Sequence, residues 1–352
     1  MIENKLKYFT NLDGLRGIAA FSVLIFHFFE NPYLTTDVLQ LDAVRKVTEV
    51  LQHGVTLFFV LSGFVITRIL LNSKSSENYF YTFYKRRILR IFPLYYLYLI
   101  VYFYIYPYIQ FGQINMDFSL QLPVYFYLQN MGWLTGLESN GPGHFWSLAV
   151  EEHFYLLWPV VVYFLPYQRI KPIVIALLIL SIPLKIYFIN SNIDINYNSF
   201  SRFDSILIGC LIAIIEKDNN YALPNIKRSM ILYALSVLFF TGAIVYFFQA
   251  LIPTLKGGVK HLILGLFFGI VIFSLVSNSE NGQFNKFLNH SVTQYMGKIS
   301  YGLYVWHMLA LSIVGHLSIV FSVLNLFLTI VLTIILAHVS YFYFEKYFIK
   351  LK

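Results

Sequence analysis

Two ionisable residues in the first apolar run of the chain could do chemistry inside a membrane. The run LDGLRGIAAFSVLIFHFF places His27 eleven residues after Arg16. In a helix, which rises about 1.5 Å per residue, the two side chains would start roughly 16 Å apart along the axis. An imidazole titrates near neutral pH and can therefore take a proton from a hydroxyl. Alone, Arg16 could be an interfacial anchor and His27 a contact between helices. The occurrence of both at this spacing favours a functional role for the pair.

A second group of cations opens the third apolar run, YKRRILRIFPLYY. Arg86 and Arg90 are four residues apart and so share one helix face, with Arg87 on a neighbouring face. Planar guanidinium groups can bind phosphate oxygens through paired hydrogen bonds. The alternative is a cluster of positive charge that fixes membrane topology. Position alone does not separate the two interpretations.

Two adjacent carboxylates, Glu151 and Glu152, lie within the apolar segment GPGHFWSLAVEEHFYLLWP. Neighbouring helix residues point about 100° apart, so we expect at most one of the two to face a given cavity. We expect Glu151 to lie at the depth of His27, where a carboxylate could orient the imidazole as a general base. The alternative is a buried ion pair with Lys185 or Arg202.

Weaker candidates for binding substrate lie in other apolar surroundings. Arg202 and Asp204 could form a local charge pair, and His307 could bind a ligand or bridge two helices. No metal-ligand spacing, phosphate-binding glycine loop or nucleophile elbow occurs, so no metal is expected. The remaining candidates for substrate binding open the segment that carries the two glutamates: His144, Trp146 and Ser147.

The composition indicates that membrane helices must position these residues. Of the 352 residues, 58% are hydrophobic and only 12% are charged, whereas about a quarter are charged in an ordinary soluble domain. A water-soluble enzyme and a disordered chain are excluded. The net charge of +8 then reflects membrane topology rather than binding of nucleic acid. The one cysteine, Cys210, cannot form an internal disulfide.

About ten segments are apolar and long enough to cross a bilayer as helices, which takes about 20 residues each. No repeat or linker divides the chain, so we expect one all-α membrane domain over residues 1–352. The segment 118–134 is too short and is expected to be interfacial or re-entrant. In FFVLSGFVIT, the small residues Ser62 and Gly63 favour close helix packing. The predicted spans are 12–29, 51–71, 91–110, 145–166, 172–190, 202–216, 229–249, 260–278, 298–317 and 319–344.

The distribution of lysine and arginine predicts the orientation. Segment 68–90 holds six of these residues and segment 111–144 holds none. Because basic residues collect in cytoplasmic loops, we expect segment 68–90 and both termini in the cytoplasm and segment 111–144 outside. Lys256 and Lys260 are exceptions to this pattern.

Seven sequence blocks, in order, resemble the acyltransferase-3 family of membrane acyltransferases. The resemblance runs from about residue 8 to 348 and implies about ten membrane spans. It also implies transfer of an acyl group, often acetyl, from cytoplasmic acyl-CoA to a hydroxyl, commonly on a cell-envelope glycan. The blocks are LDGLRGIAAFSVLIFHF, FFVLSGFVIT, YKRRILRIFPLYY, HFWSLAVEEHFYLLWP, SRFDSILIGCLIA, ISYGLYVWH and SYFYFEKYF.

The resemblance also implies roles for particular residues. Arg16 and His27 match the family's arginine-ten-residues-histidine element, in which the histidine is catalytic, as a general base or as a carrier of the acyl group. Arg86 and Arg90 match an RxxxR element that handles the CoA moiety, and we expect Arg16 to bind the phosphates of CoA with them. The adjacent glutamates match the family's acidic pair after Trp-Ser-Leu. The expected co-substrate is acyl-CoA, with acetyl-CoA the expected form.

The resemblance implies a multi-pass protein of a bacterial-type plasma membrane, with membrane lipid and a glycan or lipid-linked glycan acceptor as partners. Some relatives carry an additional extracytoplasmic hydrolase-like domain, whereas this sequence stops about where the membrane domain ends. We therefore expect direct modification of the acceptor or transfer to a separate extracytoplasmic transferase. No nucleic-acid partner is expected.

Two other functions are compatible with these residues. Intramembrane histidine, glutamate and arginine also build the proton and substrate paths of transporters and flippases, although no inverted repeat is visible in the sequence. A sensor that binds CoA thioesters without turnover is the third alternative.

Overall fold

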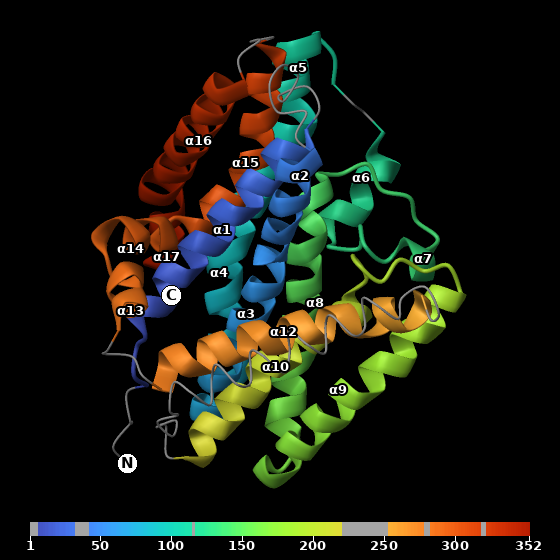
Figure 1. Ribbon diagram of the computed structural model, residues 1–352, viewed down its shortest axis with the longest axis vertical. Helices are drawn as coiled ribbons and strands as arrows, with labels where there is room; N and C mark the ends of the chain where they lie inside the picture. The colour runs from blue at the N-terminus through green and yellow to red at the C-terminus, as the bar shows by residue number, and fades with distance from the viewer. Residues whose placement is uncertain (1–5, 32–41, 115–116, 220–252, 278–281, 318–321) are drawn as a thin grey trace.

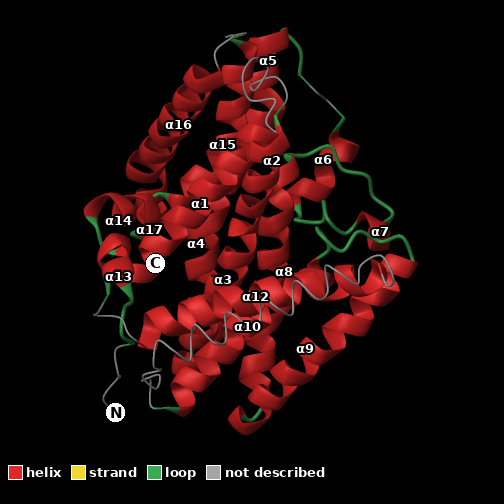
Figure 2. Cartoon of the chain, viewed as in Figure 1, coloured by secondary structure: helices red, strands yellow, loops and turns green. Residues whose placement is uncertain are grey.

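The computed structural model describes residues 6–31, 42–114, 117–219, 253–277, 282–317 and 322–352. Within these ranges the chain forms helices and no strand (Figure 2). The predicted all-α class is confirmed. The helices of 17 or more residues are α1 (Thr10–Glu30), α3 (Gly54–Ser73), α4 (Tyr79–Ile100), α8 (Trp146–Phe164), α9 (Tyr167–Asn190), α10 (Ser199–Asp218), α12 (Pro253–Ser277), α15 (Ser300–His316) and α16 (Ser322–Val339).

Shorter helices connect or extend these long ones. Two π-helical turns, Val101–Ile105 and Ser340–Glu345, carry α4 into α5 and α16 into α17. The segment predicted to be interfacial contains only α6 and α7, which are too short to cross a bilayer. The short helices are α2 (Asp42–Thr48), α5 (Tyr106–Phe111), α6 (Phe118–Tyr125), α7 (Gly132–Thr135), α13 (Gln283–Leu288), α14 (Ser291–Lys298) and α17 (Lys346–Ile349).

Six helical stretches of the described ranges are long and apolar enough to cross a membrane: Thr10–Glu30, Val44–Ser73, Tyr79–Phe111, Tyr167–Asn190, Val259–Ser277 and Ser322–Ile349. Three further predicted spans coincide with α8, α10 and α15, of which α15 has only 17 residues. The predicted span 229–249 lies outside the described residues. The count of ten and the side on which the termini lie stay predictions.

Helix α3 is the central element of the bundle, in contact with α1, α8, α10 and α12. In Figure 1, α3, α4 and α8 run along the long axis, and α10 and α12 cross their lower halves. The seam between α3 and α10 depends on two glycines. A Cβ at Gly63 would clash with the carbonyl oxygen of Ile206, and one at Gly209 with that of Val60. The predicted close packing at Gly63 is confirmed.

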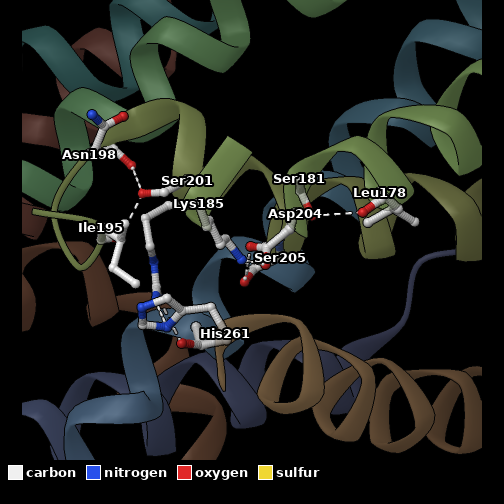
Figure 3. Close-up of polar contacts among 11 residues, drawn as sticks. Leu178, Ser181, Lys185, Ile195, Asn198, Ser201, Asp204, Ser205 and His261 are labelled. Atoms are coloured by element: carbon white, nitrogen blue, oxygen red, sulfur yellow. Dashed lines mark hydrogen bonds and ion pairs between the residues drawn. The ribbon is translucent and has the colours of Figure 1, made fainter. Parts of the chain in front are cut away.

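Two buried ion pairs tie α10 to its neighbours. Arg68 Nε of α3 lies 2.5 Å from Glu216 Oε2, and Lys185 of α9 pairs with Asp204 (Figure 3). The expectation that Asp204 pairs with Arg202, and the alternative that Lys185 pairs with a glutamate of α8, are both wrong. Residues two apart on a helix face different directions, so Asp204 faces α9 while Arg202 faces α3 and α12.

Candidate functional site

A cavity of about 860 Å³ brings together the three residues predicted to bind the co-substrate, Arg16, Arg86 and Arg90. We call it the basic cavity. Six cations and three carboxylates line it, which leaves an excess of positive charge among the described residues. The cations are Arg16, Arg86, Arg87, Arg90, Lys298 and Lys352, and the carboxylates are Asp13, Glu151 and Glu152.

The first turns of α1 hold Arg16 in place. Its Nη1 donates to Asp13 Oδ1 at 2.6 Å, and the Tyr8 hydroxyl donates to the other oxygen of the same carboxylate. Burial and the hydrogen bond to Asp13 raise the pKa of Tyr8 to about 12. The phenol therefore stays protonated at neutral pH and keeps donating to Asp13.

The start of α4 supplies three arginines to the basic cavity, one more than the sequence predicted. Arg86 and Arg90 lie on one helix face, as expected, and no carboxylate of the described residues forms an ion pair with either. Arg87 lies 5.2 Å from the ring centroid of Tyr155 on α8. The cavity is broad enough to take side chains from two neighbouring faces of α4.

Both glutamates of α8 line the basic cavity, although only one was expected to face a given cavity. Glu151 lies within electrostatic range of Arg87 and Arg16. Close to it, Ser62 Oγ of α3 and the Tyr155 hydroxyl are 2.5 Å apart. Ser62, expected only to allow helix packing, therefore also contributes a hydroxyl to this cavity.

The structure places His27 in a second cavity, of about 710 Å³, which we call the histidine cavity. The predicted pairing of His27 with Glu151 is therefore wrong, because the two residues line different cavities. Depth along a helix does not decide its lateral neighbours. Helix α1 packs against α15 and α3, whereas α8 packs against α3 and α10.

Three histidine rings meet beside the histidine cavity, which His27 and His144 line and the predicted substrate-binding residue His307 does not. The rings of His27 and His307 are stacked with centroids 5.2 Å apart, and the His144 ring is 4.9 Å from that of His307. No described residue forms a hydrogen bond with the His27 ring. In the described part of the chain, no group of three histidine, cysteine or acidic residues is arranged to hold a metal ion.

Backbone carbonyls fix the hydrogen-bonding state of the two flanking histidines. His307 Nδ1 donates to the Tyr304 carbonyl at 2.6 Å, and His144 Nε2 donates to the Val305 carbonyl at 3.2 Å. In neutral rings the opposite nitrogens are acceptors. Both acceptors, His307 Nε2 and His144 Nδ1, are buried without a partner among the described residues. His307 thus forms ring contacts with His27 of α1 and with His144, and lines neither cavity.

Tyr304 and Val55 line both cavities and so form the boundary between them. The Tyr304 hydroxyl donates to the His144 carbonyl at 2.6 Å and lies 2.5 Å from Ser147 Oγ. Ser147 lines the basic cavity and Trp146 the histidine cavity. The start of α8 thus contributes one residue to each side of the boundary.

Arg202 lies in the histidine cavity, at 3% exposure. Its Nη2 donates to Thr56 Oγ1 of α3 at 2.8 Å, and its Nη1 contacts His261 Nδ1 of α12. Asp204, also predicted to bind substrate, lines neither cavity. It is fully buried in its pair with Lys185.

Sequence reasoning missed several residues of the two cavities. Tyr304 precedes His307 by one helical turn in ISYGLYVWH, and that spacing could have identified it. His261 is an ionisable residue at the start of an apolar run, which is also a signal. Arg87 was recognised as a member of the cation group but was placed on a neighbouring face. Tyr155 and Thr56 had no such signal, because their roles depend on which helices pack together.

Comparisons with known proteins agree with this architecture. A family model described as an acyltransferase domain matches residues 9–342. The O-acetyltransferase OatA of Staphylococcus aureus (strain NCTC 8325) is 27% identical over 96% of this chain and 57% of its own length. A protein provisionally assigned as an O-acetyltransferase, SACOL0978 of S. aureus strain COL, is 28% identical over 98% of this chain and 58% of its own.

The chain thus spans slightly more than half the length of these curated relatives. No solved structure matches it. Six apolar helices together with the family match indicate a multi-pass membrane protein. Since the match covers nearly every residue from the first helix to the last, the chain belongs to the acyltransferase-3 family.

Proposed function

We propose that this protein is a membrane O-acetyltransferase that moves an acetyl group from acetyl-CoA to a hydroxyl of a cell-envelope glycan. One observation carries the proposal. The basic cavity, which suits a polyanionic donor, shares Tyr304 and Val55 as lining residues with the histidine cavity, which contains a candidate base. The relatives named as O-acetyltransferases support acetyl as the transferred group.

The donor is bound in the basic cavity. The phosphates of CoA carry several negative charges, and arginine is the side chain best suited to bind phosphate through paired hydrogen bonds. Arg86 and Arg90 are available for this because no described carboxylate is paired with them. The pantetheine arm would then extend towards Tyr304 and bring the thioester to the boundary between the cavities.

The acceptor hydroxyl enters the histidine cavity and gives its proton to His27. The hydroxyl oxygen attacks the thioester carbonyl, the new C–O bond forms and the C–S bond breaks. The proton on His27 passes to the departing sulfur, which leaves as the thiol of CoA. Base assistance of this kind is typically worth about 10²–10⁴-fold in rate. A covalent acyl-histidine at His27 is the alternative route.

The acceptor side opens away from the basic cavity, at the other end of α1. We place it outside the plasma membrane of a bacterial-type cell, where a glycan or a lipid-linked glycan is available. Delivery of the acetyl group to a separate extracytoplasmic transferase would use the same geometry. In each case the donor and the acceptor approach His27 from opposite sides of the membrane.

The test uses the full chain in lipid vesicles, with acetyl-CoA labelled in the acetyl group and a cell-envelope glycan fraction as acceptor. We expect the wild-type protein to release free CoA and to label the glycan. We expect His27→Gln to lower this rate by about 10²–10⁴-fold, with an unchanged unfolding temperature. The control is His316→Gln, since His316 is exposed and lines neither cavity.

Two results would contradict the proposal. A His27→Gln protein that keeps the wild-type rate would remove His27 from the chemistry. Movement of a labelled solute across the vesicle without release of CoA would favour a transporter.

A further inference from the structure

A buried guanidinium at one end of the histidine cavity has no carboxylate bonded to it in the described part of the chain. Arg202 donates to Thr56 and contacts His261, both uncharged partners when the imidazole is neutral. Its guanidinium carbon lies 5.4 Å from the ring centroid of Phe59 and 5.8 Å from that of Trp146. Hydrogen bonds and ring faces surround the charge but do not neutralise it.

The nearest carboxylate has its own partners. Asp204 pairs with Lys185 and accepts from the backbone nitrogen of Ser205 at 2.6 Å (Figure 3). The described residues that line the histidine cavity include Arg202 and Lys260 and no aspartate or glutamate. Among the described lining residues, cations therefore outnumber carboxylates.

Two polar atoms in this cluster are buried without a hydrogen-bond partner among the described residues: Arg202 Nε and His261 Nε2. Burial of a cation without an opposite charge is costly, and loss of hydrogen bonds adds to the cost. An oxyanion bound here would supply the missing charge and acceptor. Charge-assisted hydrogen bonds of this kind are about twice as strong as neutral ones.

The remainder of the histidine cavity suits a saccharide. The Trp146 and Tyr197 rings meet edge to face with centroids 5.1 Å apart and line the wall. Gln129 Oε1 and Asn130 Oδ1 are buried acceptors without a partner in the described ranges. Aromatic faces and amide oxygens provide apolar contact and acceptors for sugar hydroxyls.

We infer that the acceptor is a saccharide bearing a carboxylate or phosphate group, which Arg202 binds, with Lys260 beside it, while a sugar hydroxyl faces His27. This inference rests on the proposed function and adds the chemical class of the acceptor. Arg202 is then a specificity-determining residue: it selects the charge of the acceptor and takes no part in proton transfer.

The test measures binding to the purified full chain by its tryptophan fluorescence, since Trp146 lines this cavity. The three probes are methyl glucoside, methyl glucuronide and glucose 1-phosphate. We expect at least one anionic sugar to bind about tenfold more tightly than the neutral one. The preferred anion identifies whether the natural group is a carboxylate or a phosphate. Sodium phosphate alone is the fourth probe, and we expect it to bind more weakly than the preferred anionic sugar.

Substitutions then assign the effect to the cluster. We expect Arg202→Gln to remove the preference for the anionic sugar, and Arg202→Lys to restore part of it. Lys260→Gln should reduce the preference and serves as the second variant if Arg202→Gln does not fold. The matched control is Arg169→Gln, which removes an exposed arginine from α9 and should leave the preference unchanged.

The outcomes separate this inference from the proposed function. Equal binding of all three sugars would overturn the inference, as would an anion preference that survives both Arg202→Gln and Lys260→Gln. Equally tight binding of sodium phosphate would indicate a site for free anions and overturn the saccharide assignment. None of these results affects the His27-dependent release of CoA, whose absence would instead overturn the proposed function.

Discussion

Two neighbouring cationic residues at the start of α4, Lys85 and Arg86, have different surroundings. Lys85 and Arg86 are both exposed, but Lys85 lies 5.7 Å from the ring centroid of Tyr81, whereas Arg86 lines the basic cavity. Both would count equally in a cluster of cytoplasmic positive charge. Only Arg86 is placed to bind a phosphate. Substitution of each residue can therefore distinguish a role in phosphate binding from a role in membrane topology.

Removal of a cavity arginine should weaken the use of acyl-CoA. Hydrogen bonds between charged groups are worth about 1.5–3 kcal/mol, and about 1.4 kcal/mol corresponds to a factor of ten. We therefore expect Arg86→Ala and Arg90→Ala each to raise the KM for acetyl-CoA about tenfold or more, with little change in kcat. Initial rates over a range of acetyl-CoA concentrations give both constants.

The control for this prediction is Lys85→Ala, which removes a neighbouring charge outside the cavity. Its KM should stay within about twofold of the wild-type value, since isolated surface charges contribute little. An equal rise of KM in Lys85→Ala would indicate a general effect of charge and count against a phosphate site at Arg86.

Residue type and spacing indicated which side chains are candidates for the chemistry, but not which of them are neighbours. Arg86 and Arg90 share a cavity as the sequence indicated, because spacing along a helix fixes a face. His27 meets His307 instead of Glu151, because its neighbours depend on which helices pack against α1. A single sequence does not encode that order in its periodicity.

At the scale of elements, helix α3, which packs closely against α10, lines both cavities. Ser62 of α3 lines the basic cavity and Thr56 of the same helix lines the histidine cavity. The contact depends on Gly209, where a Cβ would meet the backbone of Val60 and Phe64. Neither backbone can move without shifting residues of both cavities.

Gly209→Ala should therefore destabilise the protein. Forcing extra atoms into a packed interior typically costs about 1–3 kcal/mol, and here the obstacle is backbone. We expect a lower unfolding temperature in detergent, measured by intrinsic fluorescence. Gly143→Ala is the matched control, because nothing lies within 4 Å of the added Cβ there. An unfolding temperature as high as that of Gly143→Ala would show that the seam is not tightly packed.

The fully buried ion pair between Lys185 and Asp204 joins α9 to α10 and should contribute to stability. Removing one partner of a buried ion pair leaves an uncompensated charge and costs about 3–5 kcal/mol. We expect Lys185→Met to lower the unfolding temperature strongly, and Lys185→Met combined with Asp204→Asn to recover part of the loss. If the double variant is as unstable as the sum of the two single ones, the pair does not couple α9 to α10.

Element type could be predicted well from the sequence, and element ends less well. The long apolar runs of the sequence correctly predicted the major helices of the described ranges. Helix α4, however, begins at Tyr79, twelve residues before the predicted span 91–110. The polar segment YTFYKRR continues the same helix, and hydropathy detects only the part of a helix that lies in lipid. Short helices such as α13 and α14 were not predicted, because their apolar content is too low for that rule.

At the scale of the whole molecule, one helix connects the two cavities. Arg16 and His27 lie on α1, the first in the basic cavity and the second in the histidine cavity. Their spacing along the helix corresponds to roughly 16 Å, about half the thickness of a hydrocarbon core of about 30 Å. A cytoplasmic donor can reach the arginines only if the bundle has the predicted orientation.

Labelling of introduced cysteines tests that orientation. Glu77, exposed between α3 and α4, lies on the side of the basic cavity, and Glu138, exposed between α7 and α8, lies beside Ser139 of the histidine cavity. We expect a membrane-impermeant maleimide to label Glu138→Cys in intact cells, and Glu77→Cys only after the membrane is opened. The wild-type chain is the control, because its one cysteine, Cys210, is fully buried and should stay unlabelled. The reverse pattern would place the arginines outside the cell, out of reach of cytoplasmic acetyl-CoA, and would contradict the proposed direction of transfer while leaving the two cavities intact.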